Sequence, residues 1–344
     1  MNDVHQAVVP PGAGINGALA RPWLVADIGG TNARFGWLAD GADDVAHVAT
    51  LPGADFKGPA AAAQAYLAGL AAQLGGGFQA PRAAAFAVAT AVGSDRVSFT
   101  NSGWTFSRQD TCQALALDEL ILLNDFEALA LSLPRLKAHQ LRAIGGPPRA
   151  GLSGALAVIG PGTGLGVAGI VGTPHGWVAV PGEGGHASLS AADDFESALL
   201  AAVRREHAHV SAERLLSGIG LPVLHQAVAA VMGRSSAALS AEDIVERGLS
   251  RQDAVCDRTV DSFCALLGSF AGNVALVLGA RAGVFIGGGI VPRLGERFFA
   301  SQFRERFEAK GRFQDYLRAI PTSLITDTLV ALTGAAVALD QRGR

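Results

Sequence analysis

The 344-residue chain is long enough for two domains, and its 49% hydrophobic and 17% charged residues describe a globular protein rather than a disordered one. Its formal net charge of −3 provides no basic surface for nucleic acid or for an anionic membrane. Cys112, Cys256 and Cys264 show neither metal-ligand spacing nor an even disulfide framework, which favours a reducing compartment. We therefore predict a cytoplasmic protein without a nucleic-acid or membrane partner.

Residues 1–22 contain Pro10-Pro11-Gly12 and scattered glycines. They show no basic stretch followed by an apolar core, which is the pattern of a signal peptide. We predict a disordered leader for this segment.

A strand, a glycine turn and a second strand are predicted at 23–38. The apolar run at 23–26 is typical of a buried strand, and the strand pattern resumes at 33–38. Gly29 and Gly30 permit a tight turn and a close approach to the backbone. An acid, a hydroxyl and exposed amides suit a magnesium-complexed phosphate, although an ordinary Gly-Gly hairpin is the alternative. The polar residues at the turn are Asp27, Thr31 and Asn32.

A strand, an Ala-rich helix and a buried strand follow. We predict the strands at 46–51 and 83–89 and the helix at 59–74. The polar turn at 100–104 contains Asn101, which is either a turn former or an amide that faces a ligand.

Asn124 and Asp125 stand where a predicted strand at 119–123 runs directly into a helix. Both residue types are preferred helix N-caps, so capping is the simpler interpretation. The functional alternative is a carboxylate delivered to the crevice where open α/β sheets bind ligands.

The opening pattern returns after a charged, proline-bearing stretch at 134–149, which we take as a domain boundary. Strands are predicted at 155–159 and 165–171, with a Gly/Thr turn between them that resembles the first turn. The dinucleotide pattern at 164–169 is followed by a strand where a helix is required, and no P-loop sequence is present.

The segment Pro181-Gly-Glu-Gly-Gly-His186 presents Glu183 and His186 on a glycine-rich loop. Their i, i+3 spacing matches a metal-binding helix, but proline and three glycines make a helix implausible there. Hydroxyl recognition suits such a loop better. Helices are predicted at 193–207 and from 210–213 onward, where Glu213 could simply favour the helix dipole.

The uncharged stretch at 262–280 contains Gly268 and Gly272 at the spacing of a membrane-helix dimer motif. Interrupting polar residues and close flanking charges favour a buried core helix whose glycines permit close packing. A strand at 284–286, a glycine turn, a strand at 323–326 and a helix at 329–339 complete the chain.

Together these elements resemble the bacterial glucokinases of the sugar kinase–actin–heat-shock chaperone superfamily. The resemblance covers nearly everything from Trp23 onward. It rests on Asp27-Ile-Gly-Gly-Thr-Asn-Ala-Arg34, Asn124-Asp-Phe126, Gly160-Pro-Gly-Thr-Gly-Leu-Gly166, Pro181-Gly-Glu-Gly-Gly-His186, Ser211-Ala-Glu-Arg214 and Gly283-Val-Phe-Ile-Gly-Gly-Gly-Ile290.

The resemblance implies an α/β chain with the two-domain actin-like ATPase (ribonuclease H-like) fold and an interdomain cleft. The small α/β domain would comprise 23–135 plus 326–344, and the large domain 136–325. The implied reaction is ATP-dependent phosphorylation of D-glucose to glucose 6-phosphate, the entry step of glycolysis.

The resemblance also implies roles for individual residues, with Asp125 as the catalytic base. Magnesium would be carried by ATP rather than bound directly, with Asp27 acting through water. The residues that would bind glucose are Asn101, Asn124, Asp125, Glu183, His186 and Glu213. Those that would bind ATP are Ala26, Asp27, Ile28, Gly29, Gly30, Thr31, Asn32, Gly162, Thr163, Gly164, Gly287 and Gly288.

Two alternatives stay open at this point: a kinase for another hexose, such as mannose or fructose, and an actin- or chaperone-like ATPase that would not need the acids of the cleft. The sequence departs from the family at Thr90-Ala91, where a proline is common, and it lacks the cysteine cluster of the zinc-containing sugar kinases. We do not expect a transcriptional repressor, because the 22 residues before Trp23 are too few for a helix-turn-helix. The oligomeric state is open, and a homodimer is one arrangement that the sequence permits.

Overall fold

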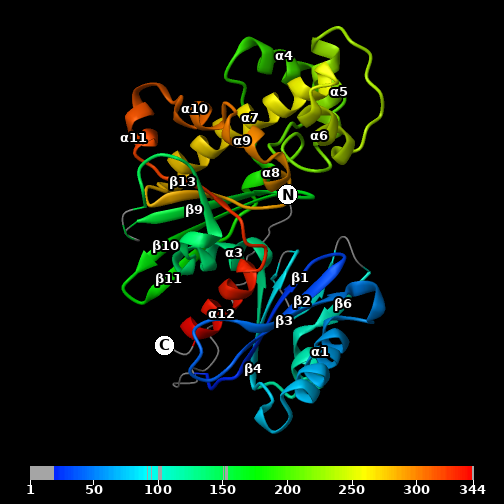
Figure 1. The fold of residues 1–344 in the computed structure, drawn as a ribbon, viewed down its shortest axis with the longest axis vertical. Coiled ribbons are helices and arrows are strands. Elements are labelled where there is room, and N and C mark those ends of the chain that lie inside the picture. The colour runs from blue at the N-terminus through cyan, green and yellow to red at the C-terminus, as the bar shows by residue number, and fades with distance from the viewer. Residues whose placement is uncertain are drawn as a thin grey trace, which may run out of the picture.

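The computed structural model describes residues 19–90, 92–93, 95–99, 103–149, 151 and 154–342. In Figure 1 the strands form two large sheets, one in blue and cyan in the lower half of the view and one in green and orange above it. A small third sheet pairs β5 (Arg96–Ser98) with β6 (Thr105–Ser107).

The first sheet has five strands in the order β3-β2-β1-β4-β7. Strands β1, β4 and β7 run parallel, whereas β2 and β3 are antiparallel to their neighbours. Helix α1 (Pro59–Leu74) packs on one face, and α12 (Val330–Arg342) packs on the other with α3 (Asp125–Ser132). The strands are β1 (Trp23–Ile28), β2 (Asn32–Leu38), β3 (Ala46–Pro52), β4 (Ala83–Val88) and β7 (Glu119–Asn124).

The second sheet has six strands in the order β11-β10-β9-β12-β13-β8. The strands β9, β12 and β13 run parallel, and β10, β11 and β8 are antiparallel to their neighbours. The strands are β8 (Leu141–Gly145), β9 (Ala155–Pro161), β10 (Leu165–Thr173), β11 (Gly176–Val180), β12 (Gly283–Ile286) and β13 (Thr322–Ile325).

The two sheets repeat one topology. In each, the first strand of an antiparallel hairpin (β1 of β1–β2, or β9 of β9–β10) also pairs with a parallel strand, β4 or β12. The second strand of each hairpin pairs on its outer side with a further antiparallel strand, β3 or β11. The prediction of two similar strand–turn–strand units is therefore confirmed, and the strand that continues the pattern at 164–169 excludes a dinucleotide-binding helix there.

The remaining helices lie mainly along the second half of the chain. They are α2 (Arg108–Ala114), α4 (Asp194–Val203), α5 (Leu221–Val231), α6 (Ala241–Ser250), α7 (Ala254–Leu278), α8 (Ile290–Leu294), α9 (Glu296–Phe299), α10 (Phe303–Glu308) and α11 (Gln314–Arg318).

Helix α7 is a buried core helix that packs against α5, α6 and α10. Within the part of the chain that the structure describes, it alone is long and apolar enough to span a membrane, yet 78% of its most apolar window is buried. A Cβ added at Gly268 or at Gly272 would clash with the α10 backbone, at the carbonyls of Phe303 and Phe307. The prediction of a core helix with glycines at a close contact is confirmed.

The predicted helix at 210–213 is wrong. Ser211 forms an isolated bridge with Ser188, irregular turns follow, and the next helix, α5, begins only at Leu221. A Cβ at Gly220 would lie 2.7 Å from the Glu213 carbonyl oxygen, so this segment folds back on itself rather than extending as a helix. Glu213 is therefore not at a helix N-terminus.

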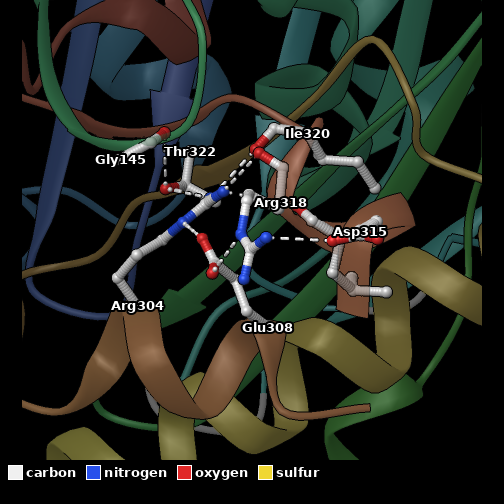
Figure 2. A network of polar contacts seen from close by, with 8 residues as sticks. Gly145, Arg304, Glu308, Asp315, Arg318, Ile320 and Thr322 are labelled. Carbon is white, nitrogen blue, oxygen red and sulfur yellow. Dashed lines mark hydrogen bonds and ion pairs between the residues drawn. The ribbon is translucent and has the colours of Figure 1, made fainter. Parts of the chain in front are cut away.

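Arg304 ties together the segments at the end of the second sheet (Figure 2). Its Nη1 donates to the Ile320 carbonyl at 2.9 Å and to Thr322 Oγ1 at 3.0 Å, and its Nε donates to Glu308 Oε1 at 2.7 Å. Thr322 Oγ1 in turn donates to the Gly145 carbonyl at 3.2 Å. One guanidinium thus joins α10 to β13 and, through Thr322, to β8.

Candidate active site

Asp27 lies near the end of β1, directly across the hairpin from Arg34. Arg34 Nη1 donates to Asp27 Oδ2 at 3.0 Å, and the Asp27 side chain is 18% exposed. Burial raises the pKa of Asp27 above its ordinary value, and the Arg34 charge opposes that rise. The ion pair therefore helps to keep a buried carboxylate ionised beside the first glycine turn.

Asn124 and Asp125 occupy the junction between β7 and α3. Asn124 is the N-cap of α3, and its Oδ1 accepts a hydrogen bond of 2.9 Å from the Phe126 amide. Asp125 Oδ1 accepts from the same amide, also at 2.9 Å. Both interpretations of this junction therefore hold: Asn124 caps the helix, and Asp125 presents a carboxylate whose Oδ2 does not bond to the Phe126 amide.

Asp125 has a strongly altered acidity. Burial raises its pKa to about 6, the Phe126 amide opposes the rise, and the negative charge of Asp27 adds to it. The parallel register of β1, β4 and β7 sets Ile28, Val88 and Asn124 level with one another, which brings Asp27 and Asp125 to the same end of the sheet. A carboxylate with a pKa near 6 is well matched to accept a proton near neutral pH.

Glu213 lies against the second glycine turn. Its Oε2 accepts a hydrogen bond of 2.8 Å from the Leu165 amide, and its Oε1 lies 3.8 Å from His186 Nε2. A Cβ at Gly164 would be 2.5 Å from Glu213 Oε2, so this approach needs a glycine in the turn. Glu213 and His186, 27 positions apart, are thus neighbours.

The loop that carries Glu183 is held against β10. Glu183 forms a parallel bridge with Val167 and is itself exposed, and the following 3₁₀ turn spans Gly184–His186. A Cβ at Gly185 would clash with the Leu165 carbonyl, and one at Gly184 would lie 2.9 Å from the Val167 Cβ, so these two positions need glycine. Glu183 and Glu213 both flank the β9–β10 hairpin.

Phe126 connects Asp125 with that hairpin. An added Cβ at Gly160 or at Gly166 would lie under 3.0 Å from atoms of the Phe126 ring. The ring therefore rests on the hairpin backbone, and Leu165, which Glu213 contacts, immediately precedes Gly166.

A pocket of about 540 Å³ opens beside the second and third glycine turns. The Gly287 amide donates to the Ile159 carbonyl at 2.8 Å, which holds the third turn against β9. At the pocket wall Arg293 Nη1 lies 3.3 Å from Glu242 Oε1. The residues that line it are Gly162, Thr163, Gly218, Ile219, Leu221, Ala241, Glu242, Val245, Gly289, Ile290 and Arg293.

The sequence did not single out the α5 and α6 residues of this pocket. Leu221, Ala241 and Val245 read as ordinary helix residues, and only their approach to the glycine turns makes them part of a site. Asn101 lies outside the described residues, so its role stays a prediction. Among the described residues, no three His, Cys, Asp or Glu side chains are grouped so that they could hold a metal ion.

A model of the glucokinase family matches residues 24–342. The chain belongs to the glucokinase family. It is 49% identical to the glucokinase of Paramagnetospirillum magneticum over 315 residues, which is 91% of this chain and 96% of the relative. It is 46% identical to the glucokinase of Neisseria meningitidis over 323 residues, or 94% and 96% of the two chains.

Solved glucokinase structures share the fold. The crystal structure of a glucokinase from an Antarctic psychrotroph has a TM-score of 0.85 and 40% identity, and the match covers 92% of this chain and 98% of that one. A ROK family glucokinase from Streptomyces griseus in complex with glucose and AMPPNP has a TM-score of 0.57 and 18% identity, with 92% and 98% covered. The second likeness shows the actin-like ATPase fold alone.

The chain catalyses the ATP-dependent phosphorylation of D-glucose to glucose 6-phosphate, as its match to glucokinases over nearly its whole length shows. The family resemblance expected from the sequence motifs is confirmed.

Proposed function

We propose that Asp125 is the general base that accepts the proton of the glucose 6-hydroxyl. The single observation that carries this proposal is the partly buried carboxylate at the β7–α3 junction, whose pKa of about 6 suits proton transfer near neutral pH. Because one Asp125 oxygen accepts from the Phe126 amide, the side chain is oriented before substrate arrives. The deprotonated hydroxyl oxygen then attacks the γ-phosphorus of ATP, the bond from that phosphorus to the β–γ bridging oxygen breaks, and ADP leaves.

The sugar hydroxyls would be held by the side chains of Glu183, His186 and Glu213 at the β9–β10 hairpin, together with those of two asparagines. Glu213 is already fixed by the Leu165 amide and faces His186, and Glu183 stands on the adjoining loop. Asn124 and Asn101 complete the proposed set. A site of this kind rejects analogues that lack a hydroxyl, because its acceptors would be left unpaired.

The three glycine turns would hold ATP. Gly29 to Asn32 and Gly162 to Gly164 offer amides and a threonine hydroxyl each to the phosphates, and Ala26, Asp27 and Ile28 complete the first turn. The adenosine would lie beside Gly287 and Gly288, in the pocket that Ile219, Leu221 and Val245 line. The bound nucleotide of the Streptomyces griseus enzyme supports an ATP site in this fold.

Magnesium would be carried by ATP and would offset the charge that develops on the phosphates. The donor set fits such an ion: Asp27 and Asp125 are close enough for the charge of one to raise the pKa of the other, and both are hard oxygen ligands. Asp27 would contact the ion through its water, since among the described residues no third acidic or imidazole side chain is grouped with these two carboxylates.

We further propose two domains, 23–135 plus 326–344 and 136–325, with the substrates in a cleft between them. The division follows the two sheets, and α12 packs against β1 and β4 of the first. Closure of the cleft on glucose would exclude water and limit ATP hydrolysis. A cytoplasmic enzyme fits the use of ATP and the three free cysteines, and a homodimer stays a proposal.

An assay of ATP consumption across a panel of hexoses, with a sugar-free blank, tests this function. We expect the highest kcat/KM with glucose, lower values with mannose and fructose, and a small blank. A larger kcat/KM for another hexose would reassign the substrate. A blank equal to the glucose rate would favour an actin- or chaperone-like ATPase.

A further inference from the structure

The Phe126 ring lies on two facing glycines of the β9–β10 hairpin. Gly160 and Gly166 are register partners in that hairpin. A Cβ added at either position would lie under 3.0 Å from ring atoms of Phe126, so no other residue type leaves the ring where it is. We call Gly160 and Gly166 the glycine socket.

Phe126 also fixes the carboxylate beside it. Its amide donates both to Asn124 Oδ1 and to Asp125 Oδ1 at 2.9 Å. The same residue thus contacts the hairpin through its ring and orients the Asp125 side chain through its backbone.

The hairpin below the ring reaches the groups proposed to hold both substrates. Leu165, next to the socket, donates to Glu213 Oε2 at 2.8 Å. On the other side, a Cβ at Gly288 would lie within 3.0 Å of backbone atoms at Gly160 and Pro161, so the third glycine turn touches the socket as well. A displacement of the hairpin relative to α3 would therefore move the substrates relative to Asp125.

Helix α3 does not depend on Phe126 for its attachment. On its other side it packs against α12, where a Cβ at Gly334 would clash with the Ala128 carbonyl. The contact of the Phe126 ring with the hairpin is thus an addition to a helix that α12 already anchors.

We propose that Phe126 is a positioning residue, whose ring in the glycine socket sets the distance and direction from Asp125 to the substrates on the β9–β10 hairpin. The inference rests on the proposed role of Asp125. A misplacement of about 1 Å between reacting groups costs on the order of 100-fold in rate, so a ring that fixes this distance acts on kcat more than on binding.

A double-mutant cycle with Phe126→Ala and Gly166→Ala tests the inference through kcat and both KM values. Each single substitution should lower kcat at least about tenfold while the KM for glucose and for ATP changes much less. In the Phe126→Ala background, Gly166→Ala should cost little, because the ring that the new methyl would strike is gone. An equal cost of Gly166→Ala in both backgrounds, or a wild-type kcat for Phe126→Ala, would overturn the proposal.

Leu131→Ala is the matched control, since Leu131 is buried in the same helix and 6% exposed. It should lower the melting temperature and leave kcat near that of the wild type. If it lowers kcat as much as Phe126→Ala does, the effect of Phe126→Ala reflects a general loss of packing in α3, and the positioning role is overturned. If Phe126→Ala fails to fold, Phe126→Leu replaces it in the cycle, with the same non-additivity expected. Asp125→Asn separates the two claims: if it slows the enzyme while Phe126→Ala does not, only the positioning inference fails.

Discussion

The β1–β2 and β9–β10 hairpins have the same backbone plan but carry different groups at the same place. One pair before the end of β1–β2, Asp27 faces Arg34. At the corresponding place in β9–β10, Gly160 faces Gly166. The first hairpin carries an ion pair at this position, whereas the second carries two residues without side chains.

The difference shows how a repeated unit can divide one task. The Asp27–Arg34 ion pair keeps a buried carboxylate available beside the first turn. The glycines of the second hairpin admit side chains from elsewhere: the Phe126 ring on Gly160 and Gly166, and Glu213 beside Gly164. The first hairpin therefore contributes its own functional groups, whereas the second receives those of α3 and of the 211–220 segment.

Gly162→Val should have the largest effect of the turn substitutions. A Cβ at Gly162 meets no protein atom within 4 Å, so the fold should be retained, while the side chain enters the space proposed for the phosphates. We expect ATP binding to be lost in calorimetry at an unchanged melting temperature. Gly69→Val, on the exposed face of α1, is the control and should keep ATP affinity. Tight ATP binding by the Gly162 variant would place the nucleotide elsewhere.

Glu213→Gln should weaken glucose binding by about 10- to 100-fold, since a hydrogen bond to a charged group is worth roughly 1.5–3 kcal/mol. The Leu165 amide can still donate to the Gln oxygen, so the hairpin should stay intact. Glu183→Gln should act in the same direction. Calorimetry with glucose measures both, and unchanged glucose affinity in both variants would contradict the proposed sugar site. ATP affinity is the internal control and should change little.

The pH dependence should follow Asp125. A base must be ionised, so kcat/KM for glucose should fall as the pH drops through the pKa of about 6, by roughly tenfold per pH unit below it. Initial rates between pH 4.5 and 8 in a buffer of constant ionic strength measure this. A flat profile through pH 6 would show that this carboxylate does not limit the reaction.

Arg34→Leu should have the smallest effect, and it tests the charged hairpin alone. Without the guanidinium, burial should raise the pKa of Asp27 further, so less of it is ionised at pH 7. We expect the affinity for Mg-ATP to fall several-fold at pH 7, on the scale of a modest ion-pair effect, and to recover in part at higher pH. Arg82→Leu, which breaks the exposed Arg82–Asp118 pair, is the control and should leave this affinity unchanged. A loss that is independent of pH would contradict the ionisation argument.

The sequence predicted the strands and hairpins well because their signals are local. Apolar runs that end at glycines fix the strands of both hairpins, and the buried run at 83–89 corresponds to β4 within one residue. The prediction of a helix from 210–213 onward was wrong because the backbone there pairs with a distant residue, in the bridge between Ser188 and Ser211. A local sequence pattern does not indicate such a bridge.

The site was predictable only as a set of separate pieces. The motifs marked Asp27, Asp125 and Glu213, but the sequence did not show that Glu213 accepts from Leu165, 48 positions away. It also treated Phe126 as part of a motif rather than as a contact. The glycine socket depends on the approach of α3 to the β9–β10 hairpin of the other sheet, which is a tertiary contact.

The central claim is that Asp125 accepts a proton, and Asp125→Asn tests it most directly through a single-turnover assay of glucose phosphorylation. Burial raises the pKa of Asp125, so its favourable contribution to folding is full below the unfolded value of 3.8 and lost as the pH rises through about 6. At pH 8 the variant should therefore melt no lower than the wild type. It should bind glucose and ATP with similar affinity and transfer phosphate about 10² to 10⁴ times more slowly. A variant with near wild-type transfer would contradict the account.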